Sequence, residues 1–154
     1  MYSVAFYTGG VPEAGPRVDT VVLAEACKQG AMIAIKADGL GYLASAAAGG
    51  PMPVAGMADI GGAIGDTITL IRGCDHVIAE AALSGTPSLT LGQPVFLSAT
   101  ALDSAVAARG NTVTSTAPSS SNTLVQTLGI AIHIPGQTDG LGFIFRPADS
   151  YTKN

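Results

Sequence analysis

The residue types in this chain that could do chemistry are few and scattered. Cys74-Asp75-His76 brings together a thiol, a carboxylate and an imidazole, the groups that a nucleophilic Cys-His site requires. Consecutive side chains of a strand point to opposite faces, so these three neighbours are unable to form a relay. The Gly-x-Ser-x-Gly, phosphate-loop and His-Glu-x-x-His signatures are absent from the chain. We therefore predict no catalytic residues and expect a protein that is not an enzyme.

Two carboxylates, Asp59 and Asp66, flank a glycine-rich segment that superficially resembles a calcium-binding loop. The Asp-x-Asp-x-Asp-Gly spacing of calcium ligands is absent from it. An Asp that precedes a strand commonly fixes a turn by accepting hydrogen bonds from nearby backbone groups. We therefore predict that Gly65 and Asp66 are turn residues, and we predict no metal or cofactor site.

The two cysteines, Cys27 and Cys74, each lie beside an apolar stretch. Cysteine in such surroundings commonly serves as a small buried hydrophobe. A single pair does not make a disulfide framework, and a reducing compartment keeps thiols reduced. Both are predicted to be structural thiols.

Composition and charge restrict the class of partner. The net charge is −4, and the seven Lys and Arg residues form no run, whereas nucleic-acid binding needs clustered positive charge. The longest uncharged stretches, residues 39–58 and 110–138, are interrupted by Gly, Pro, Ser and Asn, so no membrane-spanning helix is predicted. The first residues lack the basic region of a signal peptide, which favours a cytosol-like compartment. We expect neither a nucleic acid nor a membrane as partner.

The hydropathy of the chain is high for a protein outside a membrane. Only 12% of the 154 residues are charged, and the mean hydropathy is +0.42. Large apolar patches on proteins usually mark partner surfaces, which predicts that another chain covers part of this one. The alternative is that abundant Gly and Ala raise the index without forming a patch.

A pattern of three segments occurs twice. The first half contains residues 30–35, 53–58 and 67–73, and the second half contains residues 92–97, 126–131 and 141–147 in the same order. Each segment is short, apolar and bounded by Gly or Pro, which is typical of strands joined by tight turns. A repeat of this kind indicates a duplicated structural unit. We predict an all-β, small β-barrel-like domain built from two similar strand units.

Glycines stand at matching places in the two units. Gly56 and Gly129 each lie inside a strand-like segment, where glycine weakens a strand unless a bulge or a close backbone approach requires it. Barrel closure needs local bends of this kind. Gly56 and Gly129 are therefore predicted to be bulge residues, and Gly30 and Gly92 to be turn residues like Gly65.

The repeat also sets the predicted domain organisation. Residues 1–24 are predicted to be an extended N-terminal arm, and residues 25–154 a single β-domain. The domain divides in order into a first strand unit, a connection, a second strand unit and a tail, at residues 25–76, 77–90, 91–147 and 148–154. Residues 77–84 are either two helical turns or a strand that crosses between the units, and the lack of a 3.6-residue period favours the strand. Residues 99–121 are an insertion relative to the first unit.

The predicted arm carries aromatic side chains without strand periodicity. Tyr2, Phe6 and Tyr7 precede a run of glycines and prolines that prevents a helix. Such an arm docks either on its own domain or on a neighbouring copy, and the sequence leaves both alternatives open. The three aromatic residues are the predicted partner contacts.

Two parts of the sequence show a family resemblance. Residues 54–70, VAGMADIGGAIGDTITL, resemble the G-V-A … A-x-x-G-D-x-V-x-V signature of tailed-phage capsid decoration (cement) proteins. Residues 92–98, 112–114 and 128–131 are similar to the G-x-x-V-Y-x-S … G-x-V-T … x-G-V-A part of the same proteins. The resemblance covers residues 26–147. The arm and the 99–121 insertion depart from the minimal pattern, so no capsid contact is carried over residue by residue.

The resemblance implies a structural virion protein. It would be a β-barrel-like homotrimer on the capsid surface, made in the host cytoplasm, that stabilises the expanded shell by clamping neighbouring major capsid proteins. The alternative is a phage surface-adhesion or carbohydrate-binding β module, associated with a head fibre or a tail. That alternative would use exposed aromatic residues on loops, but the chain has no Trp.

Overall fold

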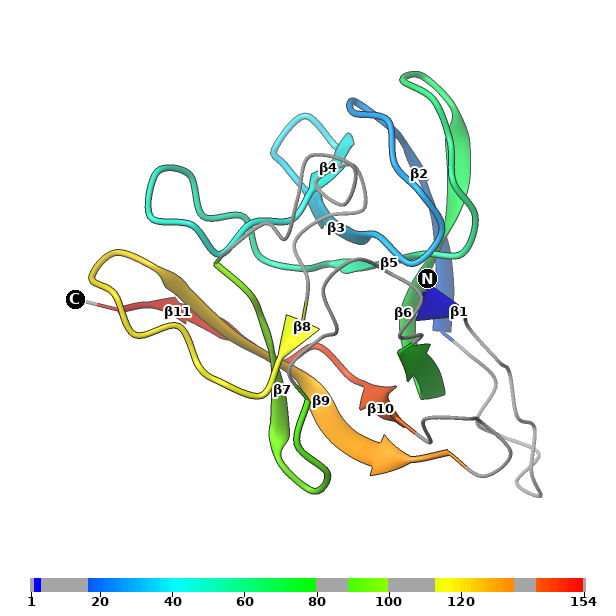
Figure 1. Cartoon of the computed structure of the whole chain (residues 1–154). Helices are drawn as coiled ribbons and strands as arrows, with labels where there is room; N and C mark the ends of the chain where they lie inside the picture. Colours follow the sequence, from blue (N-terminus) through cyan, green and yellow to red (C-terminus); the bar gives the residue numbers. More distant parts are fainter. Residues whose placement is uncertain (1, 4–16, 80–88, 100–112, 135–140, 154) are drawn as a thin grey trace.

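A computed structural model of the chain describes residues 2–3, 17–79, 89–99, 113–134 and 141–153. Every regular element within these ranges is a β-strand, as the sequence predicts (Figure 1). The strands are β1 (Tyr2–Ser3), β2 (Arg17–Val22), β3 (Met32–Ile35), β4 (Gly41–Leu43), β5 (Gly56–Ala58), β6 (Thr67–Ala79), β7 (Pro94–Leu97), β8 (Val113–Thr114), β9 (Leu124–His133), β10 (Leu141–Phe145) and β11 (Ser150–Thr152).

The strands form one curled sheet. Its order is β4-β3-β5-β6-β10-β9-β7-β8, with β1 and β2 also paired to β6 and with β11 paired to β9. All these pairs are antiparallel. The sheet curls into a half-barrel, so that the first and second halves of the chain face each other (Figure 1). The predicted small β-barrel-like domain is confirmed.

The strand order reveals the duplicated unit directly. The first unit has the order β4-β3-β5-β6, and the second has the corresponding order β8-β7-β9-β10, read from the other end of the sheet. The two units meet through their last strands, β6 and β10. Residue pairing agrees as well, because Ile33 lies opposite Gly56 in the first unit and Val95 lies opposite Gly129 in the second.

Each unit contains a row of residues that are paired across three neighbouring strands. Across β3, β5 and β6, the row consists of Met32, Met57 and Ile71, which we call the Met57 row. Across β7, β9 and β10, the corresponding row consists of Pro94, Ile130 and Ile144, which we call the Ile130 row. The two rows join corresponding strands at equivalent pairing positions, so they are structural counterparts.

Strand β6 connects the two units. Its first part pairs with β2 and β5, and its second part pairs with β10 and β1. Val77–Ala79 are the end of this strand. Of the two structures predicted for this segment, these residues form the strand that crosses between the units and not a helix. The remainder of the predicted connection, residues 80–88, lies outside the described residues.

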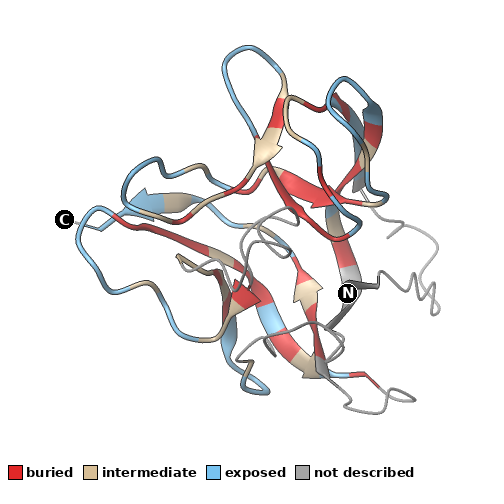
Figure 2. Cartoon of the chain, turned by 45° about the horizontal axis from the view of Figure 1, so that its top comes forward, coloured by how far each residue is buried: buried red, intermediate tan, exposed pale blue. Residues whose placement is uncertain are grey.

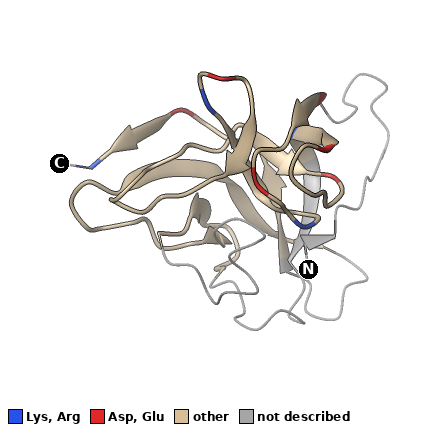
Figure 3. Ribbon diagram, turned by 90° about the horizontal axis from the view of Figure 1, so that it is seen from above, with Lys and Arg blue, Asp and Glu red and all other residues tan. Residues whose placement is uncertain are grey.

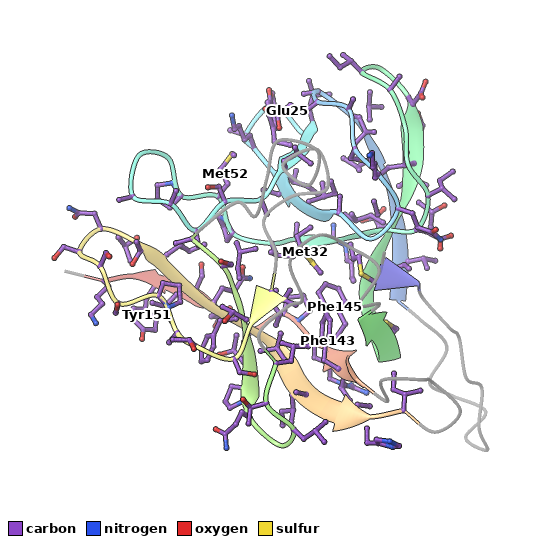
Figure 4. All side chains as sticks on the ribbon, in the orientation of Figure 1. Glu25, Met32, Met52, Phe143, Phe145 and Tyr151 are labelled. Carbon is purple, nitrogen blue, oxygen red and sulfur yellow. The ribbon has the colours of Figure 1, made fainter. Side chains whose placement is uncertain are left out.

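The described residues form two hydrophobic clusters, of which one joins the two units. The main core lies between the two units, whose facing strands are largely buried (Figure 2). There Met32 of the first unit packs with Phe143 and Phe145 of the second (Figure 4). The phenyl rings of Phe143 and Phe145 meet edge to face, with centroids 6.3 Å apart. A smaller cluster packs Val21, Leu23 and Cys27 against residues such as Ile33 on the first unit. Because Met32 and Ile33 point to opposite faces, the sheet of the first unit is buried on both sides.

The structure differs from the predicted organisation at the N-terminal boundary. Residues 17–22 form β2, which pairs along β6, and Val21 and Leu23 are buried. The predicted arm therefore does not extend to residue 24. Residues 17–24 belong to the domain because they pair with β6 and cover the smaller cluster.

Two further segments are part of the sheet. The predicted tail contains β11, which pairs with β9. Val113–Thr114, within the predicted insertion, form β8, which pairs with β7 as β4 pairs with β3. This part is therefore the counterpart of β4 and not an insertion, whereas residues 100–112 lie outside the described residues.

Candidate interaction surface

The predicted turn glycines Gly30 and Gly92 occupy equivalent turns. Their φ angles are 80° and 77°, in the left-handed region that favours glycine. The turn at Gly30 is closed by the N–H of Ala31 donating to the carbonyl of Lys28 at 3.1 Å. The turn at Gly92 is closed in the same way, at 3.0 Å between the N–H of Gln93 and the carbonyl of Thr90. Each turn leads directly into the first strand of its unit.

Gly56 and Gly129 allow the same close backbone approach. A Cβ atom on Gly56 would lie 2.8 Å from the carbonyl oxygen of Ile71. A Cβ atom on Gly129 would overlap the carbonyl oxygen of Ile144, which is the counterpart of Ile71. Gly129 also has φ 153° and lies at a register shift between β7 and β9. The predicted bulge is therefore present at Gly129, whereas Gly56 pairs without a register shift and serves the close approach alone.

Gly65 and Asp66 build a turn that leads into β6. Gly65 has φ 89°, and the Asp66 carboxylate accepts a hydrogen bond from the N–H of Ala63 at 2.8 Å. The N–H of Leu23 donates to the carbonyl of Asp66 at 2.9 Å. This turn fixes the segment after β2 against the start of β6.

The predicted aromatic contacts are described only in part. The backbone of Tyr2 pairs with Ala79 of β6 in the same chain, and Ser3 pairs with Ile78. Phe6 and Tyr7 lie outside the described residues. The side chains of Asp75 and His76 also lie outside them, although both residues belong to β6.

The two cysteines lie in different clusters. Cys27 is buried in the smaller cluster, and Cys74 is buried in the main core. Burial raises the pKa of the Cys27 thiol, which lowers the fraction of reactive thiolate. Neither position resembles the accessible, polarised setting of a nucleophilic cysteine.

We expect both thiols of the native protein to react slowly with a water-soluble thiol reagent, because both are buried. In denaturant both should react at the rate of an ordinary exposed thiol. Absorbance at the wavelength of the released chromophore, followed with and without denaturant, measures this difference. Fast reaction of either thiol in the native protein would contradict the structural role.

Gln126 connects the two units. Its side chain is 3% exposed, and its carbonyl oxygen accepts a hydrogen bond from the N–H of Val54 at 2.6 Å. Its amide group donates to the carbonyl oxygens of Val54 and Ala148, both at 3.0 Å. These bonds attach β9 to the segment before β5 and to the segment after β10. The Gln126 side chain therefore holds the two units together through hydrogen bonds to backbone groups of the protein.

A depression of about 410 Å³ lies beside Gln126. Arg72 and Asp149 contribute its charged side chains. The Arg72 guanidinium pairs with the Asp19 carboxylate at 2.9 Å. Within the residues that the structure describes, no group of three His, Cys, Asp or Glu side chains is placed to hold a metal ion. The depression therefore has charged side chains among its lining residues, but the described residues around it form no metal-binding group.

Charge is distributed unevenly between the units. Most described Asp, Glu, Lys and Arg residues lie on the turns of the first unit or near the C-terminal end (Figure 3). In the second unit, residues 89–99, 113–134 and 141–145 contain none of these four residue types. The four strands β7, β8, β9 and β10 therefore carry none of these charged residues. Asp103, Arg109 and Asp139 of the same unit lie outside the described residues.

The outer face of the second unit carries the apolar Ile130 row. Ile130, at the centre of the Ile130 row, is 50% exposed, whereas its counterpart Met57 is fully buried at 0%. Pro94 is exposed and Ile144 is half-buried. The sequence does not predict this surface, because the alternation along β9 shows that two faces exist but not which of them is covered.

Comparisons of the chain with protein-family models, with curated proteins and with solved structures find no match. In the part of the chain that the structure describes, no helix has the length and hydropathy needed to cross a bilayer.

Proposed function

We propose that this protein is a structural virion component that binds the outside of a phage capsid as a homotrimer. In this proposal it stabilises the expanded shell by bridging neighbouring major capsid proteins. The resemblance to decoration proteins at Gly56, Gly65, Asp66 and Gly129 supports the proposal. In the structure these residues form the turns and close approaches of the duplicated unit.

The observation that carries the proposal is that the described strands and turns of the second unit, residues 89–99, 113–134 and 141–145, contain no Asp, Glu, Lys or Arg. Burying a charged group against another protein costs free energy unless the charge is paired. A surface without charges avoids this cost, and its apolar area contributes to binding when it is covered. The first unit keeps charged turns, as expected of a side that remains in water. The second unit is therefore the side suited to contact with other proteins.

Bridging explains how such a module stabilises a shell. Linked contacts act at high effective concentration, so three weak contacts can gain about 10²–10⁴ in avidity over one. A protein that binds only the expanded shell also shifts the equilibrium toward that shell by mass action. Neither effect requires a reactive group.

Purified protein added to bare, expanded phage heads is expected to bind saturably and to raise the temperature at which the heads release DNA. Bound protein is measured by co-sedimentation with heads, and DNA release by dye fluorescence during heating. An absence of binding to heads would contradict the proposal. Binding to a glycan or a host surface in its place would move the function to the adhesion class.

A matched pair of variants tests the charge argument. Leu91 and Ile64 are both exposed, at 52% and 71%, and each precedes a glycine with positive φ in a turn. We expect Leu91→Glu, in the second unit, to weaken binding to heads by roughly tenfold or more, which corresponds to about 1.4 kcal/mol. Ile64→Glu, in the first unit, should bind like the wild type. Equal behaviour of the two variants would contradict the assignment of the second unit as the bound side.

A further inference from the structure

Strand β2 has one paired edge and one outer edge. Its paired edge lies along β6. Its outer edge meets β4 near its end, where Leu23 forms a bridge with Gly41. Among the described residues, no strand pairs with the outer edge at residues 18–20. An added strand would find its backbone partners at these residues.

The composition of β2 favours association through this edge. The strand reads RVDTVV, and Val and Thr are residues that favour strands. Val18 is 59% exposed and Val22 is 40% exposed. An exposed apolar edge strand offers unpaired N–H and C=O groups to another chain, and proteins commonly protect such an edge with a charged side chain. Asp19 is placed within this run of Val and Thr.

The N–H of Thr20 points to the outer edge of β2. Thr20 lies opposite Thr69 of β6, and the carbonyl of Thr69 accepts a hydrogen bond from the N–H of Asp59, on the other side of β6, at 3.1 Å. Because the backbone groups of an antiparallel strand point alternately toward and away from the paired strand, Thr69 and Thr20 are a pair without mutual hydrogen bonds. The backbone groups of Thr20 therefore face outward.

The Asp19 carboxylate occupies this outward N–H. Its Oδ1 accepts a hydrogen bond from the N–H of Thr20 at 2.8 Å. Its Oδ2 accepts a hydrogen bond from Nη2 of Arg72 on β6 at 2.9 Å. The bond from Thr20, followed by the contact with Arg72, lowers the pKa of Asp19, so the carboxylate is ionised at neutral pH.

Strand β4, at the end of the sheet, carries the same arrangement. The N–H of Ala44 donates to the carbonyl of Met32 in β3 at 2.8 Å, so the preceding N–H, of Leu43, points away from β3. The Glu25 carboxylate accepts a hydrogen bond from this N–H of Leu43 at 2.8 Å. Each of these two edge strands therefore has a carboxylate on an outward N–H.

We propose that the Asp19 carboxylate keeps the outer edge of β2 closed to strand addition by a second copy of this chain. An ionised carboxylate is an acceptor without a donor, so it repels the backbone carbonyls of an approaching strand. An added strand would also have to displace the carboxylate from Thr20 and Arg72. This inference goes beyond the proposed function and does not depend on binding to a capsid.

Sedimentation velocity over a range of concentrations tests the proposal with Asp19→Ala. This variant frees the N–H of Thr20 and removes the charge, so species larger than the wild-type species should appear at a concentration about tenfold lower or less. Asp149→Ala is the matched control, because Asp149 is also exposed and the change in charge is the same. The control should associate like the wild type. Wild-type association of Asp19→Ala, or equal association of the two variants, would overturn the inference.

The double variant Asp19→Ala with Thr20→Pro tests the hydrogen bond itself. Proline has no N–H, and edge strands accept it where the N–H faces solvent. The double variant should therefore associate like the wild type, and thermal unfolding reports whether it retains the fold. Enhanced association of a folded double variant would overturn the inference, because the effect would not depend on the N–H of Thr20.

Hydrogen exchange of the wild-type protein provides a test that needs no variant. The N–H of Thr20 should exchange more slowly than the same N–H in an unstructured peptide with the sequence of β2, because the Asp19 carboxylate is bound to it. Exchange at the rate of the peptide would show that the N–H is free, and would overturn the inference.

Discussion

Replacing Gly129 with alanine is expected to lower the free energy of unfolding by about 3 kcal/mol or more, or to prevent folding. A Cβ atom at this position would overlap the carbonyl oxygen of Ile144, which is a backbone atom of the paired strand β10. The φ angle of 153° adds strain for any residue with a side chain. Relief requires β9 and β10 to separate where Phe143 and Phe145 enter the main core. Urea unfolding followed by circular dichroism measures the change.

Two other glycines calibrate this result. Gly50→Ala should leave stability nearly unchanged, because a Cβ atom there has no neighbour within 4 Å. Gly56→Ala should cost about 1–3 kcal/mol, because the added Cβ would lie 2.6 Å from Leu70 Cγ and 2.8 Å from the carbonyl oxygen of Ile71. A Gly129→Ala variant as stable as Gly50→Ala would show that the close approach of β9 and β10 is incorrect.

Replacing Gln126 with leucine is expected to lower the free energy of unfolding by about 2–4 kcal/mol, because buried polar groups that lose their partners cost about 1–3 kcal/mol each. The substitution removes the partners of the N–H and carbonyl of Val54, a residue that is 5% exposed. It also removes the bond to the carbonyl of Ala148. The effect should fall on the contact between the units, which hydrogen exchange of the segment around Val54 would report.

The matched control is Gln93→Leu, since Gln93 is an exposed glutamine of the same unit. Its stability should stay within about 0.5 kcal/mol of the wild type, as for most surface substitutions. Gln126→Glu is a second test, because it preserves the shape of the side chain but places a carboxylate against the carbonyls of Val54 and Ala148. This variant should be destabilised at pH 7. Wild-type stability of both Gln126 variants would contradict the role of Gln126 in connecting the two units.

The sequence by itself determined the local structure of this protein. Short apolar segments bounded by Gly and Pro predicted an all-β fold, and the repeat of three segments predicted two similar units. The matching of Gly56 with Gly129 in the sequence corresponds to matching pairs in the sheet. These features were predictable because turn chemistry and side-chain alternation act over a few residues. The turn at Gly65 and Asp66 follows from the same local rules.

Only the tertiary structure decided which segments pair and which faces are covered. Residues 17–22 were assigned to an arm because their partner, β6, begins 45 residues after β2 ends. The role of Gln126 was not predictable either, since Val54 is 72 residues away in the chain. Alternation along β9 assigns Ile130 and Ala131 to opposite faces, but their burial depends on how the two units curl around the main core. The open Ile130 row is therefore a consequence of packing, because the contacts that cover or expose a face come from distant parts of the chain.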